Sequence, residues 1–276
     1  MRAWITILRP LNLLQAALAV VLAMAVLESL HQAGVLLMLV VSVMLINGAG
    51  NVINDIMDLE IDRINRPKRP LPSGGLSLAQ AWVYTVVLFA TGIILAAFIN
   101  LSSLFIAAII ALPLLVGYSL LFKRLALIGN LVVSLMLGMA FIYVGAALGR
   151  IPDMLTIAGL AFGFTLIREI VKDLEDMEGD RQEGARTLPL VWGEKKTLLF
   201  TVALILLFSL LDLLPHTLGI YDRDYLWWVL LAVNLPLWAC AVWLLRRPQH
   251  ATYARVQLIL KLDIFAGLAA IYWGTV

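Results

Sequence analysis

The chain has 276 residues, of which 62% are hydrophobic and 14% are charged, with 20 Lys and Arg residues against 18 Asp and Glu residues. Its mean hydropathy of +0.97 lies far outside the composition of soluble globular domains. These values exclude a soluble protein and indicate a polytopic membrane protein. We expect membrane lipid around it and no nucleic acid among its partners.

Hydrophobic segments, each long enough to cross a bilayer as a helix, follow one another along the whole chain. A bilayer core takes about 20 helical residues, and charged residues, prolines and glycines separate the segments. We therefore expect an all-α fold of nine transmembrane helices in one bundle, a single domain over residues 1–276. The predicted spans lie near 11–28, 35–53, 79–99, 101–121, 127–148, 153–171, 197–214, 225–245 and 257–274.

The distribution of basic residues predicts the orientation of these spans. If the N-terminus is cytoplasmic, only Arg150 and Arg223 of the 20 Lys and Arg residues fall on the far side. Cytoplasmic loops are enriched in Lys and Arg, so this orientation is favoured. We expect an integral protein of a prokaryotic cell membrane, with the functional site facing the cytoplasm.

Two acidic segments resemble each other position by position. The first is Asn54-Asp55-Ile56-Met57-Asp58-Leu59-Glu60-Ile61-Asp62-Arg63, and the second is Lys172-Asp173-Leu174-Glu175-Asp176-Met177-Glu178-Gly179-Asp180-Arg181. In each, aspartates recur at positions i, i+3 and i+7, which at about 100° per residue places the three carboxylates on one helical face.

The similarity continues after the acidic segments. Arg69-Pro70-Leu71-Pro72 is matched by Arg186-Thr187-Leu188-Pro189, and Gly75 by Gly193. The segments follow predicted spans two and six, an even number apart. The sequence therefore predicts an internal duplication of parallel units, unlike the inverted repeats of many transporters.

The six aspartates carry enough negative charge to require compensation by cations. Carboxylate and amide oxygens without Cys or His ligands select a hard ion, and Mg²⁺ usually combines one or two carboxylates with substrate phosphates. We therefore predict a Mg²⁺ site whose ligand is a phosphorylated substrate, in particular a diphosphate.

Basic residues accompany both acidic segments. Most of them serve to fix topology and to contact anionic lipid, but one or two are candidates for neutralising a departing diphosphate. The basic residues in question are Arg63, Arg66, Lys68 and Arg69 after the first segment, and Lys172, Arg181 and Arg186 around the second.

Together these motifs resemble the UbiA superfamily of intramembrane prenyltransferases. The resemblance rests on Asn54-Asp55-x-x-Asp58-x-x-x-Asp62, the following Arg-x-x-Arg-Pro-x-Arg-Pro-x-Pro-x-Gly, the second aspartate motif, and Arg9-Pro10-x-Asn12. It covers essentially the whole chain. It implies that both acidic motifs bind Mg²⁺ and the diphosphate of an isoprenoid donor, whose tail occupies an apolar cavity open to lipid.

The resemblance also assigns roles to individual residues. Metal ligands are expected at Asn54, Asp58 and Asp62 for the first site and at Asp176 and Asp180 for the second, with Asp55 and Asp173 as neighbouring or shared ligands. Catalytic roles are implied for Asp58, Asp62, Asp176, Asp180, Tyr118 and Lys123, and substrate binding for Asn12, Arg63, Arg66, Arg69, Lys172 and Arg181. The expected Tyr-x-x-x-Lys spacing is one residue longer here, between Tyr118 and Lys123.

The implied reaction ionises an allylic prenyl diphosphate and transfers the prenyl group to a lipophilic acceptor. Within the superfamily, the stretch from Arg168 to Pro189 is most similar to digeranylgeranylglyceryl phosphate synthases, which alkylate a hydroxyl of a prenylglyceryl phosphate. Aromatic quinone precursors and chlorophyllide are alternative acceptors, because their enzymes share the metal motifs.

Two other classes of function are compatible with parts of the sequence. Buried acids and internal repeats also occur in ion-coupled transporters, and Lys261 and Asp263 in the last span have no role in the predicted reaction. A non-catalytic scaffold is the third possibility. The clustering of acids at one cytoplasmic rim, in two intact copies, favours the prenyltransferase.

Overall fold

The computed structural model describes residues 2–182 and 184–275. Residues 1, 183 and 276 of the predicted domain lie outside this range. The described residues form helices and no β-strand, apart from one isolated bridge between Leu125 and Arg186. The predicted all-α fold is confirmed.

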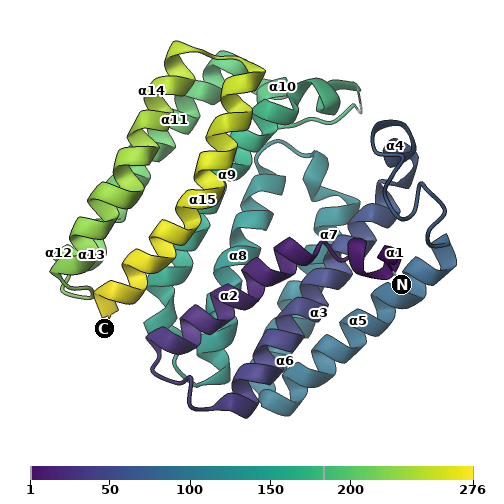
Figure 1. Ribbon diagram of the computed structural model, residues 1–276, viewed down its shortest axis with the longest axis horizontal. Coiled ribbons are helices and arrows are strands. Elements are labelled where there is room, and N and C mark those ends of the chain that lie inside the picture. The colour runs from purple at the N-terminus through teal and green to yellow at the C-terminus, as the bar shows by residue number, and fades with distance from the viewer. Residues whose placement is uncertain (1, 183, 276) are drawn as a thin grey trace. The chain divides into compact units, whose positions relative to one another are not determined.

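The helices follow one another with short connections (Figure 1). The α-helices are α1 (Arg2–Thr6), α2 (Pro10–Val26), α3 (Ala33–Met57), α4 (Leu59–Asn65), α5 (Leu78–Ile99), α6 (Leu101–Phe105), α7 (Leu112–Leu120), α8 (Ile128–Ala147), α9 (Ile151–Gln182), α10 (Leu188–Trp192), α11 (Glu194–Leu211), α12 (Leu214–Thr217), α13 (Arg223–Trp228), α14 (Leu235–Arg246) and α15 (His250–Thr275). Two π-helices, η1 (Ile106–Ala111) and η3 (Val229–Asn234), and one 3₁₀-helix, η2 (Phe122–Arg124), complete the set.

Eight helical segments of the described chain are long and apolar enough to cross a membrane. They correspond to the second to ninth predicted spans. The first predicted span coincides with α2, which is apolar but has 17 residues, the lower end of the length that spans a bilayer. The expected count of nine is therefore not confirmed. Two spans extend beyond their predicted ends, since α3 and α9 continue into the acidic segments.

The chain divides into two compact units. The first comprises residues 1–122 and 139–155, and the second comprises 123–138 and 156–276. Each unit contains one acidic segment at the end of a long helix, followed by a loop and another long helix. This order within each unit agrees with the predicted duplication.

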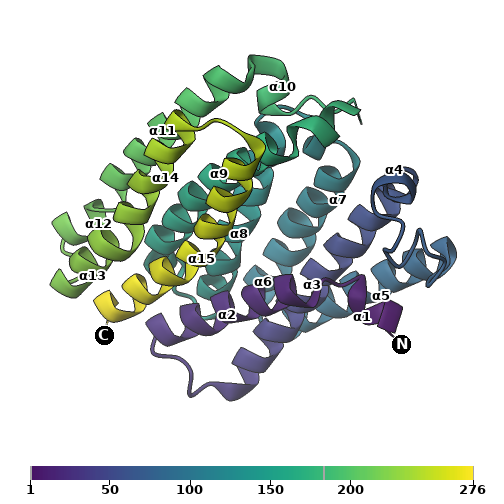
Figure 2. The same cartoon turned by 45° about the horizontal axis from the view of Figure 1, so that its top comes forward.

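In the first unit, α3 packs most extensively against α5 and also contacts α2 and α7 (Figure 2). Gly92 of α5 permits this close approach, because a Cβ atom there would lie 2.7 Å from Ile46 Cγ1. Ser42 of α3 donates a hydrogen bond to the Gly92 carbonyl oxygen at 2.8 Å, and its hydroxyl lies 2.9 Å from Tyr143 Oη. A small residue and a satisfied hydroxyl thus join these helices, as is common inside membranes.

In the second unit, α14 packs against α11 and α15, while α13 and η3 also contact α15 (Figure 1). Gly163 of α9 lies against Phe208 of α11, whose ring also makes an edge contact with Phe164.

Each π-helix ends two residues before a proline, Pro113 after η1 and Pro236 after η3. Proline lacks a backbone N–H and clashes with the preceding turn, so the regular hydrogen-bond pattern is interrupted there. The helical segments that contain these prolines, Leu101–Leu120 and Arg223–Arg246, nevertheless continue through the π-helices.

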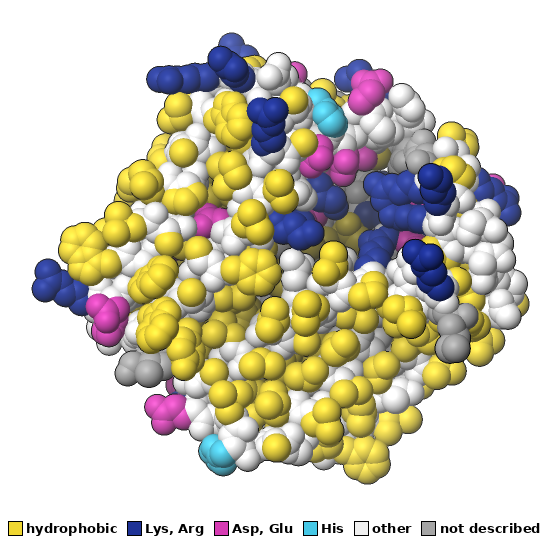
Figure 3. Space-filling view, in the orientation of Figure 1, with side chains coloured by type: hydrophobic (Ala, Val, Ile, Leu, Met, Phe, Trp, Pro, Cys, Tyr) yellow, Lys and Arg dark blue, Asp and Glu magenta, His cyan; other side chains and the backbone are white. Residues whose placement is uncertain are grey.

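Hydrophobic side chains cover much of the visible surface (Figure 3). Large apolar residues such as Leu101 and Phe98 are 80% and 74% exposed. In water such a surface would be costly, whereas in lipid it is the expected outer face of a transmembrane helix.

Candidate functional site

The first acidic segment does not form one continuous helix. Helix α3 ends at Met57 and α4 begins at Leu59, with Asp58 between them at φ −93° and ψ 6°. The single continuous helix predicted for this copy is therefore wrong, although Asp55 and Asp62 still face the same guanidinium, that of Arg69. Aspartate favours helix ends because its side chain competes for nearby backbone donors.

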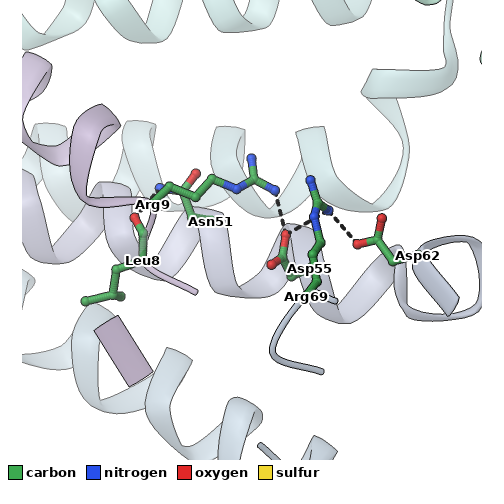
Figure 4. A network of polar contacts seen from close by, with 6 residues as sticks. All are labelled: Leu8, Arg9, Asn51, Asp55, Asp62 and Arg69. Atoms are coloured by element: carbon green, nitrogen blue, oxygen red, sulfur yellow. Dashed lines mark hydrogen bonds and ion pairs between the residues drawn. The ribbon is translucent and has the colours of Figure 1, made fainter. Parts of the chain in front are cut away.

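Asp55 and Asp62 are buried, with 3% and 4% of their surfaces exposed, and both face arginines (Figure 4). Arg69 Nη1 donates to Asp62 Oδ2 at 2.5 Å and lies 3.3 Å from Asp55 Oδ1. Arg9 Nη2 donates to the same Asp55 oxygen at 2.5 Å. One guanidinium thus joins both carboxylates, and a second one completes the pairing of Asp55.

Arg9 reaches this site from the segment between α1 and α2. Its backbone is left-handed, with φ 55° and ψ 71°, immediately before Pro10 at the start of α2. This conformation is unfavourable for a residue with a Cβ atom. The same connection is held at Leu8, whose carbonyl oxygen accepts a hydrogen bond from Asn51 Nδ2 at 2.9 Å.

A pocket of about 620 Å³ opens beside this network. It is lined by four cationic side chains, one carboxylate and neighbouring residues of two loops: Thr6, Arg9, Asp55, Arg66, Pro67, Lys68, Arg69 and Pro70. The predicted substrate-binding residues Arg66 and Arg69 therefore share one cavity. Lys68 was among the candidates for neutralising the departing diphosphate. Arg9 had no predicted substrate-binding role, although it lies within a motif that carried the family resemblance.

Two other predicted substrate-binding residues of this unit lie outside the pocket lining. Arg63 pairs with Glu60 at 2.8 Å, and both side chains are largely exposed. Asn12 is exposed in the first turn of α2. Asn54 and Asp58, predicted as metal ligands, are half-buried at the end of α3.

The second acidic segment is helical throughout, since α9 continues from Ile151 to Gln182. Asp173 accepts a hydrogen bond from Asn130 Nδ2 of α8 at 2.9 Å. Asp180 is half-buried, and Asp176 is exposed. The predicted helical face thus exists in this copy. Asn130 carried no signal in the sequence, because nothing near it in the chain points to an acidic partner.

A buried glutamate lies one turn before this motif. Glu169, 6% exposed, pairs with Arg168 at 2.7 Å and with Lys172 at 3.5 Å. Lys172 and Asp173 are neighbours along α9, so the predicted substrate-binding lysine belongs to a charged cluster beside the aspartates. Arg181 pairs with Glu178 at 3.3 Å, and both are exposed.

The loop that follows α7 meets the loop that follows the second motif. Arg186 donates its backbone N–H to the Arg124 carbonyl oxygen at 3.0 Å, within a short bridge. Lys123 lies in η2, next to this bridge, whereas Tyr118 lies in α7. The helix ends at Leu120 between them, so the extra residue in the Tyr-Lys spacing falls in a non-helical connection.

A divalent ion requires several oxygen ligands that converge on one point. Among the described residues, no three Asp, Glu, His or Cys side chains converge as a metal cage. Oxygens of Asp55 and Asp62 nevertheless converge on one cationic atom, Arg69 Nη1. Two carboxylates directed at one positive centre suit Mg²⁺, which commonly takes its remaining ligands from water and substrate phosphates.

The family of the chain follows from comparison with known proteins. The model of the UbiA prenyltransferase family matches residues 13–262. The chain belongs to the UbiA prenyltransferase family. It is therefore a membrane-embedded prenyltransferase.

Individual UbiA relatives agree over nearly the full length. A digeranylgeranylglyceryl phosphate synthase of Methanothermobacter thermautotrophicus is 40% identical over 264 residues, which cover 96% of this chain and 92% of the relative. The enzyme of the same name from Thermococcus kodakarensis is 38% identical over 270 residues, 98% of this chain and 96% of the relative.

Solved structures show the same UbiA fold. A digeranylgeranylglyceryl phosphate synthase in membranes superimposes with a TM-score of 0.85 at 33% identity, covering 99% of this chain and 98% of that one. A UbiA homologue from Archaeoglobus fulgidus bound to DMAPP and Mg²⁺ gives a TM-score of 0.72 at 19% identity, covering 98% and 99%.

Proposed function

We propose that this UbiA protein transfers a geranylgeranyl group from geranylgeranyl diphosphate to geranylgeranylglyceryl phosphate, with Mg²⁺ as cofactor, at the cytoplasmic face of a cell membrane. The proposed acceptor rests on the 40% identity to a digeranylgeranylglyceryl phosphate synthase over 96% of the chain. The reaction belongs to ether-lipid synthesis.

The acidic segments are the proposed sites for Mg²⁺, which, when bound, would neutralise the diphosphate as it leaves. Asn54, Asp55, Asp58 and Asp62 supply oxygens in the first unit, and Asp173, Asp176 and Asp180 supply them in the second. The convergence of Asp55 and Asp62 on Arg69 supports this role, because the same oxygens can face a divalent ion. The A. fulgidus homologue, which holds DMAPP and Mg²⁺, provides an analogy at the level of the fold.

The cationic pocket is the proposed site for the phosphate of the acceptor. Arg9, Arg66, Lys68 and Arg69 line it together with one carboxylate, so its charge suits an anion. Guanidinium groups bind phosphate through paired hydrogen bonds. A phosphate head carries more negative charge than the single carboxylate of the aromatic acceptors, so a pocket with four cations favours the glyceryl phosphate.

The proposed chemistry is an alkyl transfer. The allylic C–O bond breaks and the diphosphate departs with the electron pair. The glycerol hydroxyl oxygen then attacks the allylic cation, and its proton passes to the released diphosphate. Cationic side chains, for which Lys123 is a candidate in the second unit, would stabilise the charge on the leaving group. An apolar surrounding protects the cation from water.

The test is a Mg²⁺-dependent transfer assay with labelled geranylgeranyl diphosphate and a panel of acceptors. Geranylgeranylglyceryl phosphate is offered in parallel with 4-hydroxybenzoate, a dihydroxynaphthoate, homogentisate and chlorophyllide. We expect transfer to the glyceryl phosphate alone. Transfer to an aromatic or tetrapyrrole acceptor instead would overturn the acceptor assignment while keeping the enzyme class.

Substitutions of residues that line the pocket test whether it binds the acceptor phosphate. Arg66→Gln and Lys68→Gln are expected to raise KM for the glyceryl phosphate about tenfold each, because each removes one phosphate contact worth about 1.4 kcal/mol. Arg63→Gln is the matched control, since Arg63 pairs with exposed Glu60 outside the pocket lining. Asp58→Asn and Asp176→Asn should lower the rate with every acceptor by about 100-fold or more. If Arg66→Gln, Lys68→Gln and Arg63→Gln had equal KM values for the glyceryl phosphate, the proposed acceptor site would be refuted.

A further inference from the structure

Three polar side chains are buried together in the second unit, on helices that carry no acidic motif. They are Asp212 at the C-terminal cap of α11, Asn234 at the end of η3 and Asp263 in α15, and their exposed fractions are 2%, 0% and 5%. Helix α11 begins just after the second acidic segment and loop, and Asp212 lies at its other end, about 27 Å further along the helix. The mechanism proposed above uses none of these residues.

Asp212 and Asn234 are in direct contact, and α15, which carries Asp263, packs against η3, which carries Asn234. Asn234 Nδ2 donates to Asp212 Oδ1 at 3.1 Å, so the amide is directed at this carboxylate. Asp263 lies within electrostatic reach of Asp212. Tyr225 of α13 fixes the same corner by donating its hydroxyl to the Asp212 backbone carbonyl at 2.7 Å.

Three oxygens of this cluster have no hydrogen-bond partner within residues 2–182 and 184–275. They are Asp212 Oδ2, Asn234 Oδ1 and Asp263 Oδ2. Leaving one buried polar atom unsatisfied costs about 1–3 kcal/mol, and a buried unpaired charge costs more. Three such atoms at one place therefore point to a ligand that accepts their lone pairs.

The other groups around the cluster supply no positive charge. Tyr225 and Cys240 are the neighbouring titratable groups on α13 and α14. Lys261 is two residues from Asp263 on α15, about 200° around the helix, and forms no ion pair with either aspartate in the described chain. Two carboxylates thus lie inside the membrane without a basic partner, an arrangement that marks functional sites in membrane proteins.

The first unit provides an internal comparison. Its π-helix η1 also ends two residues before a proline, but Ala111 occupies the place that Asn234 has in η3. The long helix that follows its acidic segment, α5, is capped at its C-terminus by Asn100, whose side-chain amide donates to the carbonyl oxygens of Ala146 and Ala147. The fold therefore forms these turns without buried acids, and their presence in the second unit needs a separate reason.

We propose that Asp212, Asn234 and Asp263 form a binding site for a divalent hard cation, Ca²⁺ by ligand type, which links α11, η3 and α15. Two carboxylates and a divalent ion are neutral together, and this removes the cost of burying net charge. Ca²⁺ accepts carboxylate and amide oxygens in flexible geometry, whereas Mg²⁺ demands near-ideal octahedral geometry and loses its waters reluctantly. The role is structural and independent of prenyl transfer.

The test is the thermal stability of the full chain in detergent, stripped with EDTA and then titrated with CaCl₂ or MgCl₂. Wild type should gain several degrees in Tm with Ca²⁺. In Asp212→Asn and Asp263→Asn, this gain should fall to less than half. Asp224→Asn, an exposed aspartate of the adjacent helix α13, is the matched control and should keep the full gain. If both buried variants kept the full gain in Tm, or if wild type gained nothing, the cation site would be refuted. The unpaired oxygens would then be assigned to protons that the carboxylates share.

A measurement on the wild-type protein covers the case in which the variants do not fold. Tb³⁺ replaces Ca²⁺ and emits when excited through nearby aromatic side chains such as Tyr225. Its lifetimes in H₂O and D₂O report the number of bound waters. We expect a Ca²⁺-displaceable population with few waters, in addition to more hydrated Tb³⁺ at the two acidic segments. Finding only highly hydrated Tb³⁺ would refute a buried site, and neither result depends on the transferase activity.

Discussion

At the scale of single residues, the structure separates buried from exposed ion pairs around the first acidic segment. Asp62 is 4% exposed and accepts from Arg69, whereas Arg63 and Glu60 have 57% and 79% of their side chains exposed. Solvent screens the second pair, so it contributes about 0–1 kcal/mol. Removing one partner of a buried pair leaves an uncompensated charge and costs about 3–5 kcal/mol.

We therefore expect Arg69→Gln to lower the free energy of unfolding by about 3 kcal/mol, because Arg69 itself is partly exposed, and Arg63→Gln to lower it by less than about 1 kcal/mol. Reversible unfolding in SDS from detergent micelles measures both. Adding Asp62→Asn to Arg69→Gln should recover part of the loss, since it removes the charge that was left unpaired. Equal losses for the two arginine variants would contradict the assigned pairing.

At the scale of elements, close helix approach depends on particular glycines. Gly92 lies where α5 meets α3, and an added Cβ would contact Ile46 Cγ1 at 2.7 Å and the Ser42 carbonyl oxygen at 3.2 Å. We expect Gly92→Ala to destabilise the protein by about 1–3 kcal/mol, because α3 and α5 must move apart. Gly159→Ala in α9 is the control, since nothing lies within 4 Å of its added methyl group, and it should be neutral or stabilising. Unfolding curves in detergent compare the two, and a neutral Gly92→Ala would show that this contact is loose.

At the scale of the whole molecule, the prediction concerns orientation in the bilayer. The only cysteine, Cys240, is buried, so a Cys240→Ala background permits single reporter cysteines. Arg66→Cys should react with a membrane-impermeant maleimide from the cytoplasmic side only, and Asp224→Cys from the opposite side only. Both positions are exposed. Labelling of the two from the same side would contradict the topology inferred from the basic residues.

The sequence by itself determined the membrane class, the long helices and the two acidic segments. These are local properties: apolar runs set the helices, and the recurrence of aspartates at i, i+3 and i+7 is visible without any partner. It did not reveal the helix end at Asp58, since the periodicity continues across the break.

The tertiary structure alone decided which groups meet. Arg9 contacts Asp55 across 46 positions, and Asn130 contacts Asp173 across 43. Asp212 and Asp263 lie in two apolar spans far apart in the sequence, and only the folded chain shows that Asp212 meets the amide of Asn234 and that α15, which carries Asp263, packs against η3. Such pairings depend on how helices cross and rotate. Periodicity along one helix says which side a residue occupies but not which distant residue lies opposite.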